Sequence, residues 1–270
     1  MRSIRTIAAF GLILAAGAAS AQEKRDPISA FLTPPWTVTL GAELRYAPRW
    51  DGSEDHRYFP LPIVSIRPAG TPYRFQSPRD GIAIGLIDTG RFRIGPVGKL
   101  RTEHKPSKDA KLAGLDDVDW TVEIGGFVEY WWVPWLRTRA EVRQGIGGHK
   151  GVIGDLMADV VLPVTPQLTL SAGPRLTAAS AAALNPYFGV DLPESLASGL
   201  PTYRVSGGLR SYGVGAQARY AWTQQWATHL FVEYDRLVGR VADSPVVALR
   251  GSRDQWTVGG GVTYTFDMGW

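Results

Sequence analysis

The chain has 270 residues, of which 29 are basic, 25 are acidic, four are histidine and none is cysteine. The absence of cysteine excludes a disulfide framework, a thiolate metal site and a cysteine nucleophile, and so few histidines argue against a histidine-rich zinc site. The near balance of charge argues against nucleic acid as a partner, because nucleic-acid-binding domains carry a strong basic excess.

The first 21 residues have the layout of a secretory signal peptide. Arg2 and Arg5 precede an apolar run over 7–19, and Ala19-Ser20-Ala21 forms a small-x-small cleavage site. The apolar run is shorter than the roughly 20 residues that a spanning helix needs. We therefore predict a cleaved Sec signal peptide at 1–21, a periplasmic N-terminal segment at 22–35 and a barrel over 36–270.

From residue 36 onward, apolar and polar residues alternate over several segments. The first segment carries an apolar row at every second position: Trp36, Val38, Leu40, Ala42, Leu44 and Tyr46. The same alternation recurs at 120–130, 136–143, 226–235 and 256–270. Because successive side chains of a strand point to opposite faces, each segment is predicted to be a strand with one apolar face.

Aromatic residues stand at the ends of these apolar rows. The pairs are Trp36 and Tyr46, Trp120 and Tyr130, and Trp226 and Tyr234. A strand of about 9–11 residues crosses a bilayer, so such pairs would lie in the two aromatic girdles of an outer-membrane barrel. A soluble sandwich would explain the alternation, but it explains the aromatic ends and the export signal less well. The pattern favours an all-β, transmembrane, antiparallel up-and-down β-barrel in the bacterial outer membrane.

Tight connections and long loops alternate along the chain. Bacterial barrels have short periplasmic turns and longer external loops, so this alternation predicts twelve strands with both termini in the periplasm. Ten strands are the alternative if the short, proline-rich segments between 60 and 88 merge or fail to span. The twelve are expected at 36–46, 60–67, 72–77, 81–88, 91–101, 120–132, 135–145, 151–162, 167–177, 203–221, 226–237 and 255–266.

Charges of both signs occupy the inward rows of three neighbouring strands. The middle strand carries three arginines and its two neighbours carry carboxylates. These residues are Arg137, Arg139 and Arg143, flanked by Glu123 and Glu129 and by Asp155 and Asp159. A selective pore would show a ring of one sign, whereas unpaired charges in a narrow lumen are costly. We therefore predict a lumenal charge network that fills a narrow barrel.

Asp243-Ser244-Pro245 invites a hydrolase interpretation. A serine nucleophile needs a histidine base beside it, yet no histidine is near in the sequence and the G-x-S-x-G elbow is absent. Asp-Ser-Pro also starts turns by its own side-chain hydrogen bonds. We expect no catalytic residue, with a lipid-modifying hydrolase as the remote alternative.

Three further groups of residues favour structural roles. The glycine-rich turn 147–151 lacks the spacing of a phosphate-binding loop, and the acidic loop 51–55 lacks that of a calcium loop. His229 shares the inward face of its strand with Glu233 and Asp235, where we expect it to hydrogen-bond inside the lumen. We expect neither a metal nor a cofactor.

Several loop motifs resemble those of the MipA/OmpV family of outer-membrane proteins. The most specific are Gly148-His149-Lys150-Gly151, Tyr187-Phe188-Gly189-Val190 and Ala242-Asp243-Ser244-Pro245. Others are Tyr46-x-Pro48 with Asp51-Gly52-Ser53, Pro60-Leu61-Pro62, Gly95-Pro96, Gly173-Pro174, Ser198-Gly199-Leu200-Pro201-x-Tyr203, Tyr234-x-Arg236-Leu237, Gly251-Ser252-x-Asp254-Gln255 and Tyr264-x-Phe266. Together they span nearly the whole mature chain.

The resemblance implies an outer-membrane barrel without known catalysis. The family's namesake is described as a scaffold that joins a murein-degrading lytic transglycosylase to a murein-synthesising penicillin-binding protein, and other members are linked to osmotic response, adhesion and antibiotic susceptibility. We therefore expect a scaffold in peptidoglycan remodelling, with outer-membrane lipids and the barrel-assembly machinery as further partners. A narrow channel for small solutes is the alternative.

The end of the chain departs from the family pattern, which typically stops at the aromatic residue matching Phe266. Here Asp267-Met268-Gly269-Trp270 follow and keep the alternation. We expect the C-terminal assembly signal to comprise Tyr264, Phe266 and Trp270. Either Phe266 or Trp270 would then be the terminal aromatic residue.

Overall fold

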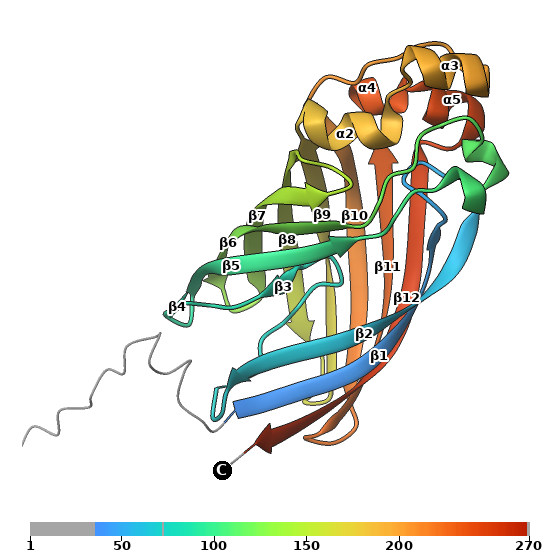
Figure 1. The fold of residues 1–270 in the computed structure, drawn as a ribbon. Coiled ribbons are helices and arrows are strands. Elements are labelled where there is room, and N and C mark those ends of the chain that lie inside the picture. Colours follow the sequence, from blue (N-terminus) through green and yellow to red (C-terminus); the bar gives the residue numbers. More distant parts are fainter. Residues whose placement is uncertain (1–35, 72, 269–270) are drawn as a thin grey trace, which may run out of the picture.

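The computed structural model describes residues 36–71 and 73–268, which form a nearly closed, antiparallel, all-β barrel (Figure 1). The prediction of the barrel fold is confirmed. The predicted signal peptide, the segment 22–35 and Trp270 lie outside the described residues.

The strands follow one another around the wall in sequence order. The longer ones are β1 (Trp36–Pro48), β2 (His56–Pro68), β5 (Phe92–Arg101), β6 (Thr121–Val133), β7 (Leu136–Gly147), β8 (Val152–Pro163), β9 (Leu168–Ala179), β10 (Gly208–Ala221), β11 (Trp226–Leu237) and β12 (Asp254–Met268). The first pairs with the last, from Trp36 opposite Met268 to Tyr46 opposite Val258. The two-residue strands β3 (Ile82–Ala83) and β4 (Ile87–Asp88) pair with β5.

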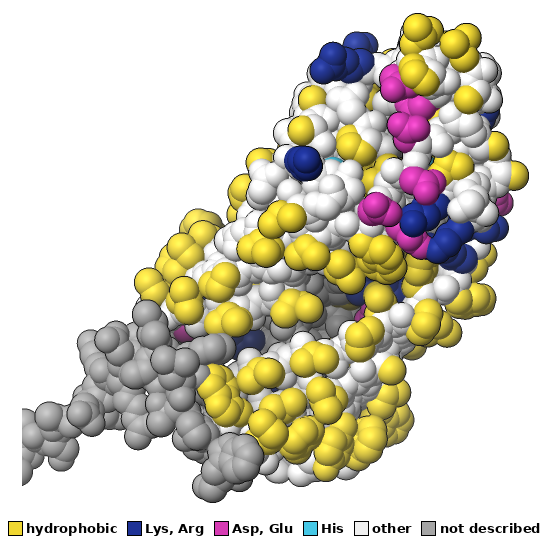
Figure 2. All heavy atoms as spheres, in the orientation of Figure 1, with side chains coloured by type: hydrophobic (Ala, Val, Ile, Leu, Met, Phe, Trp, Pro, Cys, Tyr) yellow, Lys and Arg dark blue, Asp and Glu magenta, His cyan; other side chains and the backbone are white. Residues whose placement is uncertain are grey.

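The outer surface of the wall is an apolar band. Leucine, valine and isoleucine side chains of the outward rows are exposed, as far as 68% for Leu230, and Figure 2 shows hydrophobic side chains gathered in bands over the strands. Aromatic pairs mark both ends of this band: Tyr46–Tyr58 and Tyr234–Trp256 at one end, and Tyr130–Trp132, Tyr220–Trp222 and Trp226–Tyr264 at the other. None of the described helices is long and apolar enough to cross a membrane.

The prediction of a strand at 72–77 is wrong for residues 73–77, which the structure describes and which form no strand. Residues 73–81 leave the wall after β2, and the turn is closed by Ser77, whose amide donates to Asp80 Oδ2 at 3.0 Å. The strand expected at 81–88 is reduced to β3 and β4. Its backbone nevertheless follows β5 closely, because a Cβ at Gly95 would lie 1.9 Å from the carbonyl oxygen of Ile84.

Short helices cover the end of the barrel that carries the long loops (Figure 1). They are α2 (Ala181–Phe188), α3 (Leu192–Ser198), α4 (Gly239–Ala242) and α5 (Pro245–Arg250), with 3-10 turns η1 (Pro106–Lys108) and η2 (Ala110–Leu112). Buried residues including Phe188, Val205 and Val247 pack them into a small core. Tyr203 forms an isolated β-bridge with Val190 in this cap, so β10 begins at Gly208 and not at the predicted residue 203.

Candidate functional site

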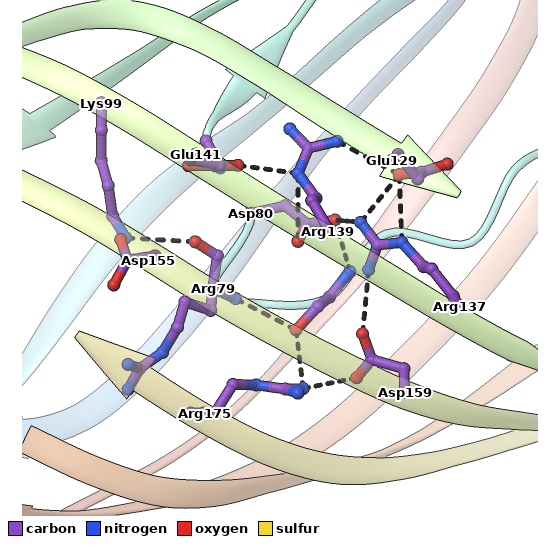
Figure 3. Close-up of polar contacts among 12 residues, drawn as sticks. Arg79, Asp80, Lys99, Glu129, Arg137, Arg139, Glu141, Asp155, Asp159 and Arg175 are labelled. Carbon is purple, nitrogen blue, oxygen red and sulfur yellow. Dashed lines mark hydrogen bonds and ion pairs between the residues drawn. The ribbon is translucent and has the colours of Figure 1, made fainter. Parts of the chain in front are cut away.

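A stretch of chain crosses the inside of the barrel. This inner segment comprises residues 73–81, between β2 and β3. Asp80 lies between Arg137 and Arg139, with carboxylate–guanidinium distances of 2.6 and 3.7 Å. The amide of Gly81 donates to Glu141 Oε1 at 3.1 Å, and Arg79 pairs with Asp235 on the far wall. Figure 3 shows Arg79 and Asp80 among the charged side chains of the neighbouring strands. The inner segment is therefore attached to both sides of the lumen.

Arg137 is the centre of the lumenal charges. Its guanidinium has no exposed area and pairs with Asp80, Glu129 and Asp159 at 2.6, 2.9 and 3.0 Å. The neighbouring Arg139 pairs with the same glutamate at 3.2 Å. Each carboxylate in this group faces at least one arginine, which offsets the cost of burying it.

The same network continues toward the external loops and across the wall. Arg143 pairs with Glu123 at 2.9 Å and with Asp155 at 2.5 Å. Arg175 pairs with Asp159 at 2.6 Å. The structure thus places all seven residues that the sequence analysis assigned to the lumen on the inward face, and each makes an ion pair there.

Sequence reasoning left several members of the network unassigned. Glu141 and Arg175 occupy inward positions of predicted strands, so the alternation contained a signal for both. Arg79 and Asp80 carried no such signal, because they lie between two expected strands. Their position inside the lumen depends on the turn at Ser77, which periodicity does not reveal.

The inner segment separates two cavities. The turn-end cavity, of about 490 Å³, is lined mainly by apolar residues such as Phe75, Trp131, Val133 and Val161. The outer chamber, of about 330 Å³, lies beneath the helical cap and is mixed in character. Its residues include Trp50, Asp51, Phe59, Leu61, Lys99, Leu100, Arg101 and His104.

The outer chamber holds charges that are balanced by short ion pairs. Asp51 pairs with Arg101 and, at 2.7 Å, with Arg210. Burial alone would raise the pKa of the Asp51 carboxyl, but the two guanidinium groups lower it below its ordinary value. The imidazole of His104, packed against Trp50 and Tyr187, is buried, and this burial lowers its pKa to about 4.

The depressed pKa of His104 predicts acid sensitivity. An unfolded chain binds a proton at this histidine near pH 6.5, whereas the folded chain does so only near pH 4. Titration of His104 therefore leaves the free energy of unfolding unchanged above pH 6.5. Between pH 6.5 and 4 it lowers that free energy by roughly 2–3 kcal/mol. Urea unfolding in vesicles between pH 7.5 and 4.5 measures the loss, and His104→Phe should abolish this component. Equal pH dependence of the two proteins would contradict the assignment.

The other groups noted in the sequence have local partners. His229 Nε2 lies 2.6 Å from Glu43 Oε2, whereas Glu233 and Asp235 face Arg79. In the part of the chain that the structure describes, no group of three or more histidine and carboxylate side chains is arranged to hold a metal ion. The hydroxyl of the buried Ser244 donates to the carbonyl of Phe188 at 2.6 Å, as part of a helix cap.

The structure also shows the conformation of the external glycine turn and the position of the aromatic residues of the last strand. Gly147 adopts φ +112°, a backbone region that favours glycine, and His149 Nε2 lies 3.3 Å from Glu123. Tyr264 packs against Trp226 with ring centroids 4.8 Å apart and ring planes tilted by 49°, on the outward face of β12. Phe266 follows it two positions later on the same face.

A family model described as "MltA-interacting protein MipA" matches residues 40–266, almost all of the described barrel. The chain belongs to the MipA family. Together with the apolar band and its aromatic ends, this membership places the MipA-family chain in the bacterial outer membrane. No curated protein matches it.

Solved structures of other outer-membrane barrels are similar in fold. The NanC porin is 10% identical, with 86% of this chain and 100% of the porin covered and a TM-score of 0.42. An outer-membrane channel from Pseudomonas putida F1 is 9% identical, with coverages of 87% and 97% and a TM-score of 0.39. The N-terminal barrel of Pseudomonas aeruginosa OprF is 10% identical, with coverages of 85% and 97% and a TM-score of 0.26.

Proposed function

We propose that this barrel is a non-enzymatic scaffold that holds a murein lytic transglycosylase and a penicillin-binding synthase beneath the outer membrane. The family match over residues 40–266 carries this proposal, since the family is described by its interaction with MltA. The inner segment supports it as well, because a lumen crossed by a segment that Asp80 and Arg137 tie to the wall is better suited to anchoring than to transport.

The turn-end cavity is the surface that we assign to the partner. It opens among the short turns, which face the periplasm in a barrel of this type. Trp131, Val133 and Pro134 give it an apolar floor, and Arg74, Arg91 and Arg219 contribute positive charge. An apolar pocket with a few placed charges is a common binding site for a protruding segment of a partner.

A matched pair of photo-crosslinkers tests the scaffold role. Trp135 lies in a periplasmic turn and Trp120 lies at the opposite end of β6, and both are 49% exposed. A benzophenone amino acid at position 135 should crosslink the transglycosylase or the synthase in intact envelopes. The same group at position 120 should crosslink neither. Crosslinking that is equal at both positions, or no greater than with an unrelated barrel, would contradict the proposal.

The two alternatives from the sequence have less support. A solute channel requires a continuous path, whereas the inner segment divides the lumen into two cavities. A lipid hydrolase requires an accessible nucleophile beside a base, whereas Ser244 is fully buried and caps α5. Unchanged envelope lipids in Ser244→Ala cells would remove this residue as a nucleophile.

A further inference from the structure

The barrel wall is open between β2 and β5. The sheet begins at β2 and ends at β3 and β5, and no register joins these edges among the residues that the structure describes. β3 covers β5 only as far as Gly98, which lies opposite Ile82. The last part of β5, from Lys99 to Arg101, therefore has a partner strand on one side only.

Proline removes hydrogen-bond donors from the β2 edge, which contains Pro60 and Pro62. Within sheets, proline is confined to edge strands, with its nitrogen on the unpaired side. On the other side of the opening, Pro96 of β5 is already covered, since its carbonyl accepts from the amide of Ile84 at 3.1 Å. The β2 edge is thus poorly suited to close on β5 or to accept a strand from a second protein.

The outer chamber extends to this opening. Phe59 and Leu61 line it from β2, and Lys99 and Leu100 line it from β5. The first two share the inward face with Arg45 and Glu43 of β1, so an apolar lip borders a charged interior. Figure 2 shows the result as a hollow between two hydrophobic bands, with basic side chains at its inner margin.

The chamber contains two buried nitrogen atoms without a hydrogen-bond partner. They are the indole nitrogen of Trp50, which is a donor, and Nδ1 of His104, which donates in one of the two tautomers. The two residues are only 6% and 4% exposed. The ammonium of Lys99 donates to the carbonyl of Arg79 at 3.1 Å. The carboxylate of Asp155 is its main opposite charge, although no carboxylate among the described residues lies within ion-pair distance of it. These groups together fit a ligand that brings one anionic acceptor into the chamber.

We propose that the opening is a lateral portal through which a glycerophospholipid of the surrounding membrane inserts its head group. The phosphate would lie near Lys99 and the unbonded donors, and the acyl chains would pass between Leu61 and Leu100 into the bilayer. An unpaired sheet edge is not stable against hydrocarbon, and the ester and phosphate oxygens of such a lipid supply acceptors there. A chamber of about 330 Å³ is within the range of small-ligand sites.

Phospholipid is favoured over the two other occupants of this position. A second copy of the chain would have to pair with the β2 edge, which lacks donors at Pro60 and Pro62. Lipopolysaccharide carries several acyl chains and more than one phosphate, whereas Lys99 is the one lysine among the described residues that line the chamber. The lipid site does not depend on the scaffold role.

Native mass spectrometry tests the portal. The full-length protein is reconstituted in vesicles of phosphatidylethanolamine and phosphatidylglycerol and extracted into mild detergent. The mass of the intact protein with any bound lipid is then measured. We expect one phospholipid to remain per chain. Lys99→Met should lower its retention about tenfold, because a charge-assisted hydrogen bond is lost, and Leu100→Trp should lower it by narrowing the portal.

Two matched variants serve as controls. Lys150→Met alters an exposed lysine of an external turn, and Leu230→Trp alters an outward leucine of β11, 68% exposed against 61% for Leu100. Both should retain the lipid, and all variants are compared only after the heat-modifiable gel shift shows a folded barrel. Retention that is absent in the unmodified chain, equal in all variants, or confined to added lipopolysaccharide would overturn the proposal.

Discussion

Replacing Arg137 with methionine should lower the free energy of unfolding by about 3–5 kcal/mol. The guanidinium is completely buried and is the shared partner of Asp80, Glu129 and Asp159. Methionine keeps most of the volume but leaves these carboxylates with too few cations. Urea unfolding of the purified protein in vesicles, followed by tryptophan fluorescence, measures the effect.

The control for this variant is an arginine in an exposed pair. Arg236 bonds Asp254 at 2.7 Å, but both side chains are more than 40% exposed. Exposed pairs contribute little, because water and salt screen them. Arg236→Met should therefore leave the unfolding midpoint unchanged. Similar losses in Arg137→Met and Arg236→Met would show that the buried network does not stabilise the barrel.

Substituting Gly125 by alanine should cost about 3 kcal/mol, although it adds a single methyl group. A Cβ at this inward position would lie 1.8 Å from the carbonyl oxygen of Val142 and 2.7 Å from the Cα of Arg143. Both are backbone atoms of the adjacent strand, so relief requires the strands to separate. The heat-modifiable gel shift and urea unfolding report the loss of stability.

Gly126 provides the comparison at the next position of the same strand. A Cβ there would meet nothing nearer than the carbonyl oxygen of Gly95, at 3.7 Å, an ordinary contact. Gly126→Ala should be tolerated, and it tests whether the cost at Gly125 arises from close approach of strands or from β-propensity. Equal destabilisation by both substitutions would contradict the steric explanation.

The outward face of the barrel could be predicted from the sequence because its physical requirement is simple. Lipid on one side and a filled lumen on the other impose a period of two, which the row from Trp36 to Tyr46 displays directly. The lumenal residues Arg137 to Arg143 followed from the same period. The carboxylates that pair with these arginines from the two adjacent strands were predictable too, because those strands carry the opposite charge at their inward positions.

The inner segment could not be predicted, because its apolar and polar residues alternate as they do in a strand. Tyr73 and Phe75 alternate with polar residues, as lipid-facing aromatic residues would. In the structure their rings lie under Arg219 and Arg137, at 4.0 and 5.2 Å from the guanidinium carbons. Alternation alone does not distinguish an aromatic ring facing lipid from one stacked on an arginine inside the lumen.

The external cap was missed for a different reason. Its helices are only four to eight residues long, too short for a helical period to stand out in loops that were identified by their length. Local capping signals were present, since Asp191 and Glu194 form a capping box at the start of α3. The cap depends on packing between distant loops, such as Phe188 against Val247, which one sequence does not display.

Single-channel recording of the purified protein in planar bilayers tests most directly whether the barrel is filled. With Arg79 and Asp80 paired to opposite walls, the inner segment crosses the lumen between the turn-end cavity and the outer chamber. We therefore expect no large and stable conductance at neutral pH. Large, stable openings from the unmodified chain would show that the lumen conducts, and would contradict the account of a closed barrel that acts as a platform.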